Sequence, residues 1–351
     1  MKQLKLSMCV LLAITILSCD RFANEPKVYD SFTWERTSIT CSHTSSVAVE
    51  NNGDVWASGV DSEALRTVVY LSTDNGDTWV KKGIFPDVSS ITINPRNGYI
   101  FTSVSSYAGL FRSNNRGENW ENIISINTHD ILVTEFGGIY IGVRYSSYYK
   151  GVFYSSDNGN NWTQKSNGLP DEDVLSLALG LDGTLYAGTY NFGVYRSTNG
   201  GNTWLPSTNY TDVVISSLTV SNDGSIFATA TPFSNRVTFN PPPPIGVLKS
   251  TDRGVTWYQV NTGLAIAEGV GVIMYNHITN EIFINTGAYL SRVIYRSTNL
   301  GASWELQNDG MANDLHISEF AYNPMTGQMF AATSDGVYRR YRSSEGVKEI
   351  Q

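Results

Sequence analysis

The sequence predicts an all-β fold, a single seven-bladed β-propeller of four-stranded antiparallel blades. Seven tryptophans recur between Trp34 and Trp304, at intervals of 45, 41, 42, 42, 53 and 47 residues. One eight-residue turn motif ends at six of them, and seven apolar hairpins alternate with the motifs. Repeats of this length bury their apolar faces only against neighbouring repeats, so they indicate a closed array of blades.

The turn motif reads Ser-x-(Asp/Asn)-x-Gly-x-x-Trp, and each copy is called a tryptophan turn below. Its third residue can accept a hydrogen bond from the backbone two residues on, while Gly tolerates positive φ and Trp buries its ring. Because acids and amides interchange at this position, we predict a structural role and no proton transfer. The six residues are Asp74, Asn115, Asp157, Asn199, Asp252 and Asn299.

The hairpins alternate apolar and polar residues around a short turn, most clearly at Asp182-Gly183. Such a pattern is a strong hairpin signal. The last hairpin precedes a strand that contains Gly336, and no Trp follows it, whereas Trp34 stands alone before the first hairpin. We therefore predict that the N-terminal strand completes the last blade and closes the ring. The seven hairpins span 46–58, 88–104, 130–143, 174–189, 213–230, 269–286 and 317–333.

The tryptophan turn resembles the Asp-box (BNR) repeat of sialidases, sortilin-type receptors, xyloglucan-degrading glycosidases and photosystem II assembly factors. The overall resemblance is to single-propeller proteins such as these assembly factors and related bacterial lipoproteins. Since propellers serve many activities, the resemblance implies a fold and leaves the activity open. Sialidase activity is disfavoured, because the chain lacks an Arg-Ile-Pro motif and seven blades are expected where sialidases have six.

The N-terminus carries two lysines and then an apolar run, Val10 to Leu17, that is too short to span a bilayer. The run ends in Ile-Leu-Ser-Cys19, which resembles the lipobox of bacterial lipoproteins and implies cleavage before an acylated Cys19. The alternative is an ordinary secretory signal with an incidental cysteine. We expect a signal peptide over 1–18, a lipidated tether over 19–30, the propeller over 31–342 and a tail over 343–351. The expected location is the bacterial cell envelope, facing the periplasm or the cell surface.

The net charge bears on the class of partner, and the cysteine content bears on disulfide bonding. Loss of Lys2 and Lys5 with the signal takes the formal net charge from −8 to −10, which argues against nucleic acid as a partner. Cys9 leaves with the signal and Cys19 would be lipidated, so Cys41 has no intramolecular disulfide partner. We expect a monomer that binds no cofactor and touches the membrane only through its anchor.

One face of the ring is expected to bind a ligand. If the strands of a blade are lettered a to d from the axis outward, the a–b and tryptophan turns share one face. The b–c and d–a loops share the other, called the loop face, and the b–c loops are aromatic and basic. Tyrosines suit sugar rings or peptide side chains, although exposed single aromatics are also normal in β-proteins. The candidates are Tyr107, Arg144, Tyr145, Tyr148, Tyr149, Tyr190, Phe192, Arg236, Tyr289 and Arg292.

Acidic residues precede strand a in six blades: Asp87, Asp130, Asp173, Asp212, Glu268 and Asp314. They predict a carboxylate ring at the channel mouth that binds a cation or a basic peptide group, with Asp130, Asp212 and Asp314 as candidate ligands. Acid–base catalysis is a second interpretation, and capping of backbone N–H groups is a third, which the regular recurrence favours. The four histidines have no metal-ligand spacing, so we expect no metal site.

We therefore predict a non-catalytic binding or scaffold lipoprotein that presents its loop face to a protein segment or a glycan. The alternative is a glycoside hydrolase that uses Asp87 or Asp173 within a pair of carboxylates, which such enzymes hold about 5 to 9.5 Å apart. The sequence names neither the ligand nor the membrane leaflet.

Overall fold

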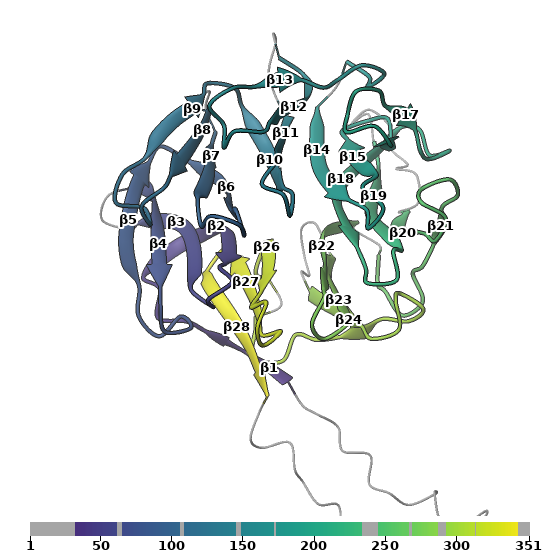
Figure 1. The fold of residues 1–351 in the computed structure, drawn as a ribbon. Helices are drawn as coiled ribbons and strands as arrows, with labels where there is room; N and C mark the ends of the chain where they lie inside the picture. The colour runs from purple at the N-terminus through teal and green to yellow at the C-terminus, as the bar shows by residue number, and fades with distance from the viewer. Residues whose placement is uncertain are drawn as a thin grey trace, which may run out of the picture. The chain divides into compact units, whose positions relative to one another are not determined.

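A computed structural model describes residues 32–61, 65–105, 109–144, 149–171, 173–233, 245–266, 269–286, 293–312 and 314–342. Within these residues the chain is all β, and its strands form seven four-stranded antiparallel sheets arranged in a ring around a central axis, called the channel below (Figure 1). The predicted seven-bladed propeller is thus confirmed. The expected signal peptide, tether and tail lie outside the described residues. The described part of the chain contains no helix suited to crossing a membrane.

Blades 1 to 6 each run in chain order from the innermost to the outermost strand, and blade 7 takes its outermost strand from the N-terminus. Blade 1 holds β2 (Cys41–Val49), β3 (Val55–Asp61), β4 (Arg66–Ser72) and β5 (Val80–Phe85); blade 2 holds β6 (Val88–Ile93), β7 (Ile100–Val104), β8 (Gly109–Ser113) and β9 (Glu121–Ile124). Blade 3 holds β10 (Thr128–Val133), β11 (Ile139–Val143), β12 (Gly151–Ser155) and β13 (Thr163–Gln164); blade 4 holds β14 (Val174–Leu179), β15 (Leu185–Thr189), β16 (Val194–Ser197) and β17 (Leu205–Pro206). Blade 5 holds β18 (Val213–Val220), β19 (Ile226–Pro232), β20 (Gly246–Ser250) and β21 (Tyr258–Gln259); blade 6 holds β22 (Val270–Asn276), β23 (Glu281–Thr286), β24 (Val293–Ser297) and β25 (Glu305–Leu306). Blade 7 holds β26 (Ile317–Tyr322), β27 (Met329–Thr333), β28 (Gly336–Arg342) and β1 (Phe32–Arg36).

The core is divided among the seven junctions between neighbouring blades. The second strand of a blade is buried on both of its faces, so it reads as an unbroken apolar or small-residue run, as in Ile139–Val143. At the junction of blades 1 and 2, for example, Trp56 and Val69 pack against Ile91 and Ile100. Because each cluster draws on two blades, no blade can bury its own apolar surface without its neighbours.

The tryptophan turns staple the two outer strands of six blades. In the first turn, Asp74 Oδ1 accepts hydrogen bonds from the Ser72 hydroxyl and from the backbone N–H of Thr78, both at 2.8 Å. The backbone N–H that bonds the Asp74 side chain therefore lies four residues after it in sequence. The prediction of a bond to the N–H two residues after it was wrong. The span is longer because Asn75 and Gly76 both take positive φ, which inserts a wider loop. The other five turns repeat this bond, with acid or amide alike.

The N-terminal strand closes the ring, as the solitary Trp34 predicts. Trp34 is 2% exposed and packs on Phe283 and Phe320. Its indole N–H donates to the carbonyl of Gln307 at 2.9 Å, just as that of Trp304 donates to Val260 at 2.7 Å. Trp34 thus takes in blade 7 the place that Trp304 takes in blade 6, although no tryptophan turn precedes it.

Candidate functional site

Four of the ten aromatic or basic loop-face candidates lie in the described residues: Arg144, Tyr149, Tyr190 and Phe192. The structure does not describe the other six, Tyr107, Tyr145, Tyr148, Arg236, Tyr289 and Arg292. The four described residues belong to the b–c loops of blades 3 and 4, so they share one sector of the loop face.

An aromatic cluster bridges blades 4 and 5 in this sector. The rings of Tyr190 and Phe233 meet edge to face with centroids 5.4 Å apart. Phe192 is 40% exposed, and two contacts hold its backbone nearby: its N–H donates to the Thr189 hydroxyl, and it forms an isolated parallel β-bridge with Val213 on blade 5. These three aromatics, Tyr190, Phe192 and Phe233, are called the loop-face cluster below. Hydrogen bonds hold the backbone N–H groups of all three residues, so a ligand would meet aromatic side chains on an ordered backbone.

Blade 3 contributes a basic group, Arg144, next to blade 4. Arg144 donates a hydrogen bond at 2.8 Å to His129 Nε2, while His129 Nδ1 donates at 3.0 Å to the carbonyl of Leu175 on blade 4. Burial and the neighbouring guanidinium lower the pKa of His129 to about 4. The imidazole is therefore neutral at physiological pH, and the positive charge of the pair belongs to Arg144. Tyr149, 48% exposed, packs on Phe153 of the same blade.

The acidic residues of the predicted carboxylate ring occupy two kinds of position, before an innermost strand or inside one. Asp87, Asp173, Asp212 and Asp314 do precede the innermost strands, and the backbone carbonyls of the first three accept N–H groups from the ends of the paired second strands. Asp87 and Asp173 belong to blades 2 and 4, with blade 3 between them. Glu268 lies outside the described residues.

Asp130 was assigned to the wrong position. It lies inside β10, not before it, directly after an irregularity in the pairing with β11. A β-bulge re-aims the side chain that follows it. The Asp130 carboxylate accepts backbone N–H groups of Ile131, at 2.8 Å, and of Leu177 on blade 4, at 2.6 Å. Asp130 therefore fastens blade 3 to blade 4.

The same contact recurs around the channel and forms a set of latches between blades. In each latch, a side chain after the bulge of an innermost strand accepts a backbone N–H of the next blade's innermost strand. The pairs are Ser46 with Ile91, Asp130 with Leu177, Ser176 with Leu218, Ser217 with Ile273 and Glu319 with Val47. Each polar latch residue is followed in sequence by an apolar one, a signal that could have revealed the set.

Glu319 is the latch that joins blade 7 to blade 1. Its Oε2 accepts hydrogen bonds from the Ser46 hydroxyl and, at 3.2 Å, from the backbone N–H of Val47. The side chain lies deep within the ring of sheets while part of its surface stays open to the channel. Burial raises the pKa of Glu319 to about 8, and the charge of Asp130 adds to the rise, although the two hydrogen bonds oppose it. Burial also raises the pKa of Asp130 to about 6.

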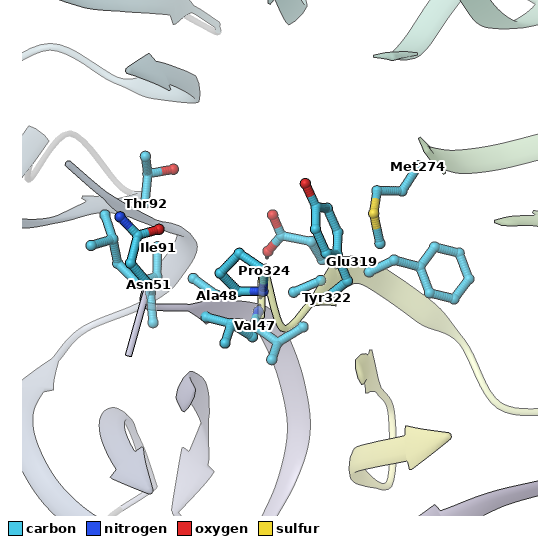
Figure 2. Close-up of a pocket in the computed structure, with 13 residues that line it drawn as sticks. Val47, Ala48, Asn51, Ile91, Thr92, Met274, Glu319, Tyr322 and Pro324 are labelled. Atoms are coloured by element: carbon cyan, nitrogen blue, oxygen red, sulfur yellow. Dashed lines mark hydrogen bonds between the residues drawn. The ribbon is translucent and has the colours of Figure 1, made fainter. Parts of the chain in front are cut away.

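A hollow of about 360 Å³ opens beside Glu319 at the end of the channel where innermost strands run into the a–b turns. Figure 2 shows Thr92 and Asn51 on one side, Met274 on the other, and Glu319 with Tyr322 between them. The sequence directed the search for a ligand to the loop face, whereas this hollow lies at the opposite end of the channel. It is lined by residues 47–49 of β2, 91–93 of β6, Met274 of β22, 319–322 of β26, and the turn residues Asn51 and Pro324.

Metal binding has no support among the side chains that the structure describes. They include no group of three or more His, Cys, Asp or Glu residues placed to hold a metal ion. Cys41, the cysteine within the described fold, is buried and has a free thiol. Within the described residues, the hollow and the loop-face cluster are two features that could receive a ligand.

Comparison with known proteins supports the fold and leaves the activity open. A family model described as the DUF6242 β-propeller domain matches residues 28–179, less than half of the chain. No curated protein sequence matches the chain. Among solved structures, the GH74 xyloglucanase of Xanthomonas campestris aligns with 87% of this chain at a TM-score of 0.63 and 14% identity. The alignment covers 53% of the xyloglucanase, so this chain spans about half of its length.

Two further structures are matched over nearly their full length. YCF48 bound to D1 peptide aligns with 90% of this chain and 98% of its own, at a TM-score of 0.62 and 16% identity. A catalytically inactive variant of virginiamycin B lyase from Staphylococcus aureus, solved with quinupristin, aligns with 88% of this chain and 99% of its own, at a TM-score of 0.63 and 13% identity. At identities this low, the structural similarity shows a shared β-propeller fold and nothing about activity.

The raised pKa of Glu319 gives a pH-dependent stability with a defined sign. A carboxyl whose pKa is higher in the folded than in the unfolded chain stabilises the fold below about pH 4.3, and this contribution is lost as the pH rises towards 8. Glu319→Gln keeps an acceptor for Ser46 and Val47 and cannot ionise. We expect it to be more stable than the unsubstituted protein at pH 9, by about 1–3 kcal/mol, and equally stable at pH 4.

Urea unfolding at pH 4 and pH 9 measures this difference. Glu305→Gln, which changes an exposed carboxylate on the outermost strand of blade 6, is the matched control. Its unfolding free energy should match that of the unsubstituted protein at both pH values. Parallel losses of stability in the Glu319→Gln and unsubstituted proteins between these pH values would contradict the interpretation.

Proposed function

We propose that this chain is a non-catalytic binding protein of the bacterial cell envelope whose loop face receives a protein segment or a glycan. The observation that carries the proposal is the loop-face cluster, in which Tyr190, Phe192 and Phe233 gather at the junction of blades 4 and 5. Aromatic rings with ordered backbones bind sugar faces and peptide side chains at a small entropic cost. Arg144 supplies a positive charge in the same sector.

The channel carboxylates support a binding role over a catalytic one. Asp130 uses both of its oxygens on backbone N–H groups, and Glu319 joins two blades, so each has a structural task. The hydrolase alternative names Asp87 or Asp173, and these two cannot be neighbours on one blade or on adjoining blades, because they belong to blades 2 and 4. YCF48 bound to D1 peptide illustrates that a propeller of this kind can hold a peptide. For the present chain, a peptide ligand is part of the proposal.

The proposal places the propeller on the outer side of a membrane, attached by acyl chains on Cys19. Several acyl chains on one residue give stable anchoring, whereas a single chain gives marginal binding. The residues between Cys19 and β1 would then serve as the tether. This arrangement would leave the propeller free to meet partners near the membrane surface.

Metabolic labelling tests the anchor. Cells that express the full chain and grow with radiolabelled palmitate should incorporate label into the unsubstituted protein, and Cys19→Ala should abolish it. Cys41→Ala is the matched control, because the Cys41 thiol is buried in the fold, and it should retain the label. Label that persists in Cys19→Ala would refute lipidation at this residue.

Array screening tests the loop face. The full chain in detergent is applied to an oligosaccharide array and to an array of overlapping peptides from secreted bacterial proteins. We expect a ligand whose affinity falls about tenfold or more in Tyr190→Ala/Phe192→Ala, because truncation of anchoring aromatics removes most of the binding energy at such surfaces.

Tyr258→Ala is the control for this screen, since Tyr258 is an exposed aromatic on the outermost strand of blade 5. It should bind like the unsubstituted protein. A ligand that tolerates the double substitution would remove the loop-face cluster from the site. Cleavage of an arrayed oligosaccharide, lost in Asp87→Asn or Asp173→Asn, would favour the hydrolase.

A further inference from the structure

The hollow beside Glu319 is separate from the loop face, and the proposed function makes no use of it. Its volume of about 360 Å³ lies at the lower end of the range of about 300–1,000 Å³ that ligand sites occupy. Its walls are largely apolar and come from the innermost strands of blades 1, 2, 6 and 7. A small ligand could therefore contact side chains of four blades there.

The charge around the hollow has one sign. None of the described residues that line it is basic, and Glu319 is its one acidic group. Asp130, on the innermost strand of blade 3, acts on Glu319 through its charge. Among the described lining residues, Tyr322, on the same strand, is a further titratable group, and its ring lies 6.3 Å from that of His277 in the turn after β22. Once Glu319 is ionised, a cation in the hollow would meet its negative charge, and none of the described lining residues supplies a competing positive one.

The position of the carboxyl group leaves one oxygen for a ligand. In the described part of the chain, the hydrogen bonds of Glu319 from Ser46 and Val47 both end on Oε2. Oε1 therefore remains available on a side chain that lines the hollow. Beside it, the Tyr322 ring and the Met274 thioether offer polarizable surfaces (Figure 2), which favour a cation and its alkyl stem.

We propose that this hollow is a binding site for an organic cation with an apolar stem and a terminal ammonium, which pairs with the Glu319 carboxylate while the stem packs on Ile93, Met274 and Tyr322. The cation is either a free alkylamine or the lysine side chain of another protein, and the two share this chemistry. Pairing removes the proton of Glu319, which passes to the solvent, and the ammonium keeps its own protons.

This proton release gives the site a signature that an apolar pocket lacks. Burial keeps Glu319 largely protonated at pH 7, because its pKa is about 8. An alkylammonium stays charged up to about pH 10. Its affinity should therefore rise about tenfold per pH unit between pH 6 and 8 and level off above, with about one proton released per ligand at the lower pH.

Titration calorimetry with the full chain tests the proposal, using hexylamine as the probe at pH 6.5, 7.5 and 8.5 in two buffers of different ionisation enthalpy. Hexylamine should bind with the stated pH dependence, and hexanol, which lacks the charge, should bind at least tenfold more weakly. Glu319→Gln should weaken hexylamine binding at least tenfold at pH 8.5 and abolish the proton release. Glu305→Gln, on the outermost strand of blade 6, should change neither.

A second arm replaces hexylamine with a tripeptide that has blocked ends and a central lysine. Tighter binding of this peptide than of hexylamine would identify a protein lysine as the source of the cation, and the reverse order would identify a free amine. The proposal is overturned if hexanol and hexylamine bind equally, if Glu319→Gln leaves the affinity unchanged while its circular dichroism is native, or if neither amine binds. These outcomes do not depend on the loop-face cluster, so they leave the proposed function untouched.

Discussion

The pairing of β1 with β28 is the contact on which the closed ring depends, since it joins the two ends of the propeller. Two sets of bonds fasten the junction of blades 7 and 1, and a third lies within blade 7 itself. Near the channel, Glu319 binds Ser46 and Val47; further out, the Thr44 hydroxyl donates to the carbonyl of Thr333 at 2.8 Å. Within blade 7, directly after β1, the backbone N–H of Thr37 donates to the carbonyl of Val337 on β28 at 2.9 Å. Because every apolar cluster lies between two blades, loss of this junction would expose core on both sides of the break.

The inner latches place polar chemistry at the centre of an otherwise apolar array. Serine, aspartate and glutamate occupy equivalent positions in different blades and accept the same kind of backbone N–H. Where the side chain is a hydroxyl, the contact is neutral at every pH. In blades 3 and 7 it is a carboxyl, whose burial raises its pKa. The two acids therefore give the channel a proton-dependent charge that a serine latch would not provide, and this property underlies both the stability profile and the proposed cation site.

The sequence predicted the repeating features of this fold and missed the irregular ones. Tryptophan spacing determines the blade count, and the solitary Trp34 reveals how the ring closes, because both follow from the period of the repeat. The turn at Asp74 spans four residues, not two, since two successive residues take positive φ, which the motif alone does not specify. Asp130 was assigned to a loop because the bulge before it breaks the simple alternation of a strand. The hollow was not predicted, since it is assembled from four blades whose lining residues read individually as ordinary strand residues.

Hydrogen exchange of individual backbone amides tests most directly whether β1 is an integral part of the ring. The N–H of Trp34 is bonded to the carbonyl of Asp309 at 2.7 Å, and the N–H of Leu177 is bonded to Asp130 at an inner latch. If closure through β1 holds the blades together, both amides should exchange only through global unfolding and give the same opening free energy. An opening free energy for Trp34 several kcal/mol below that of Leu177 would mean that β1 detaches while the ring persists, which would contradict this mode of closure.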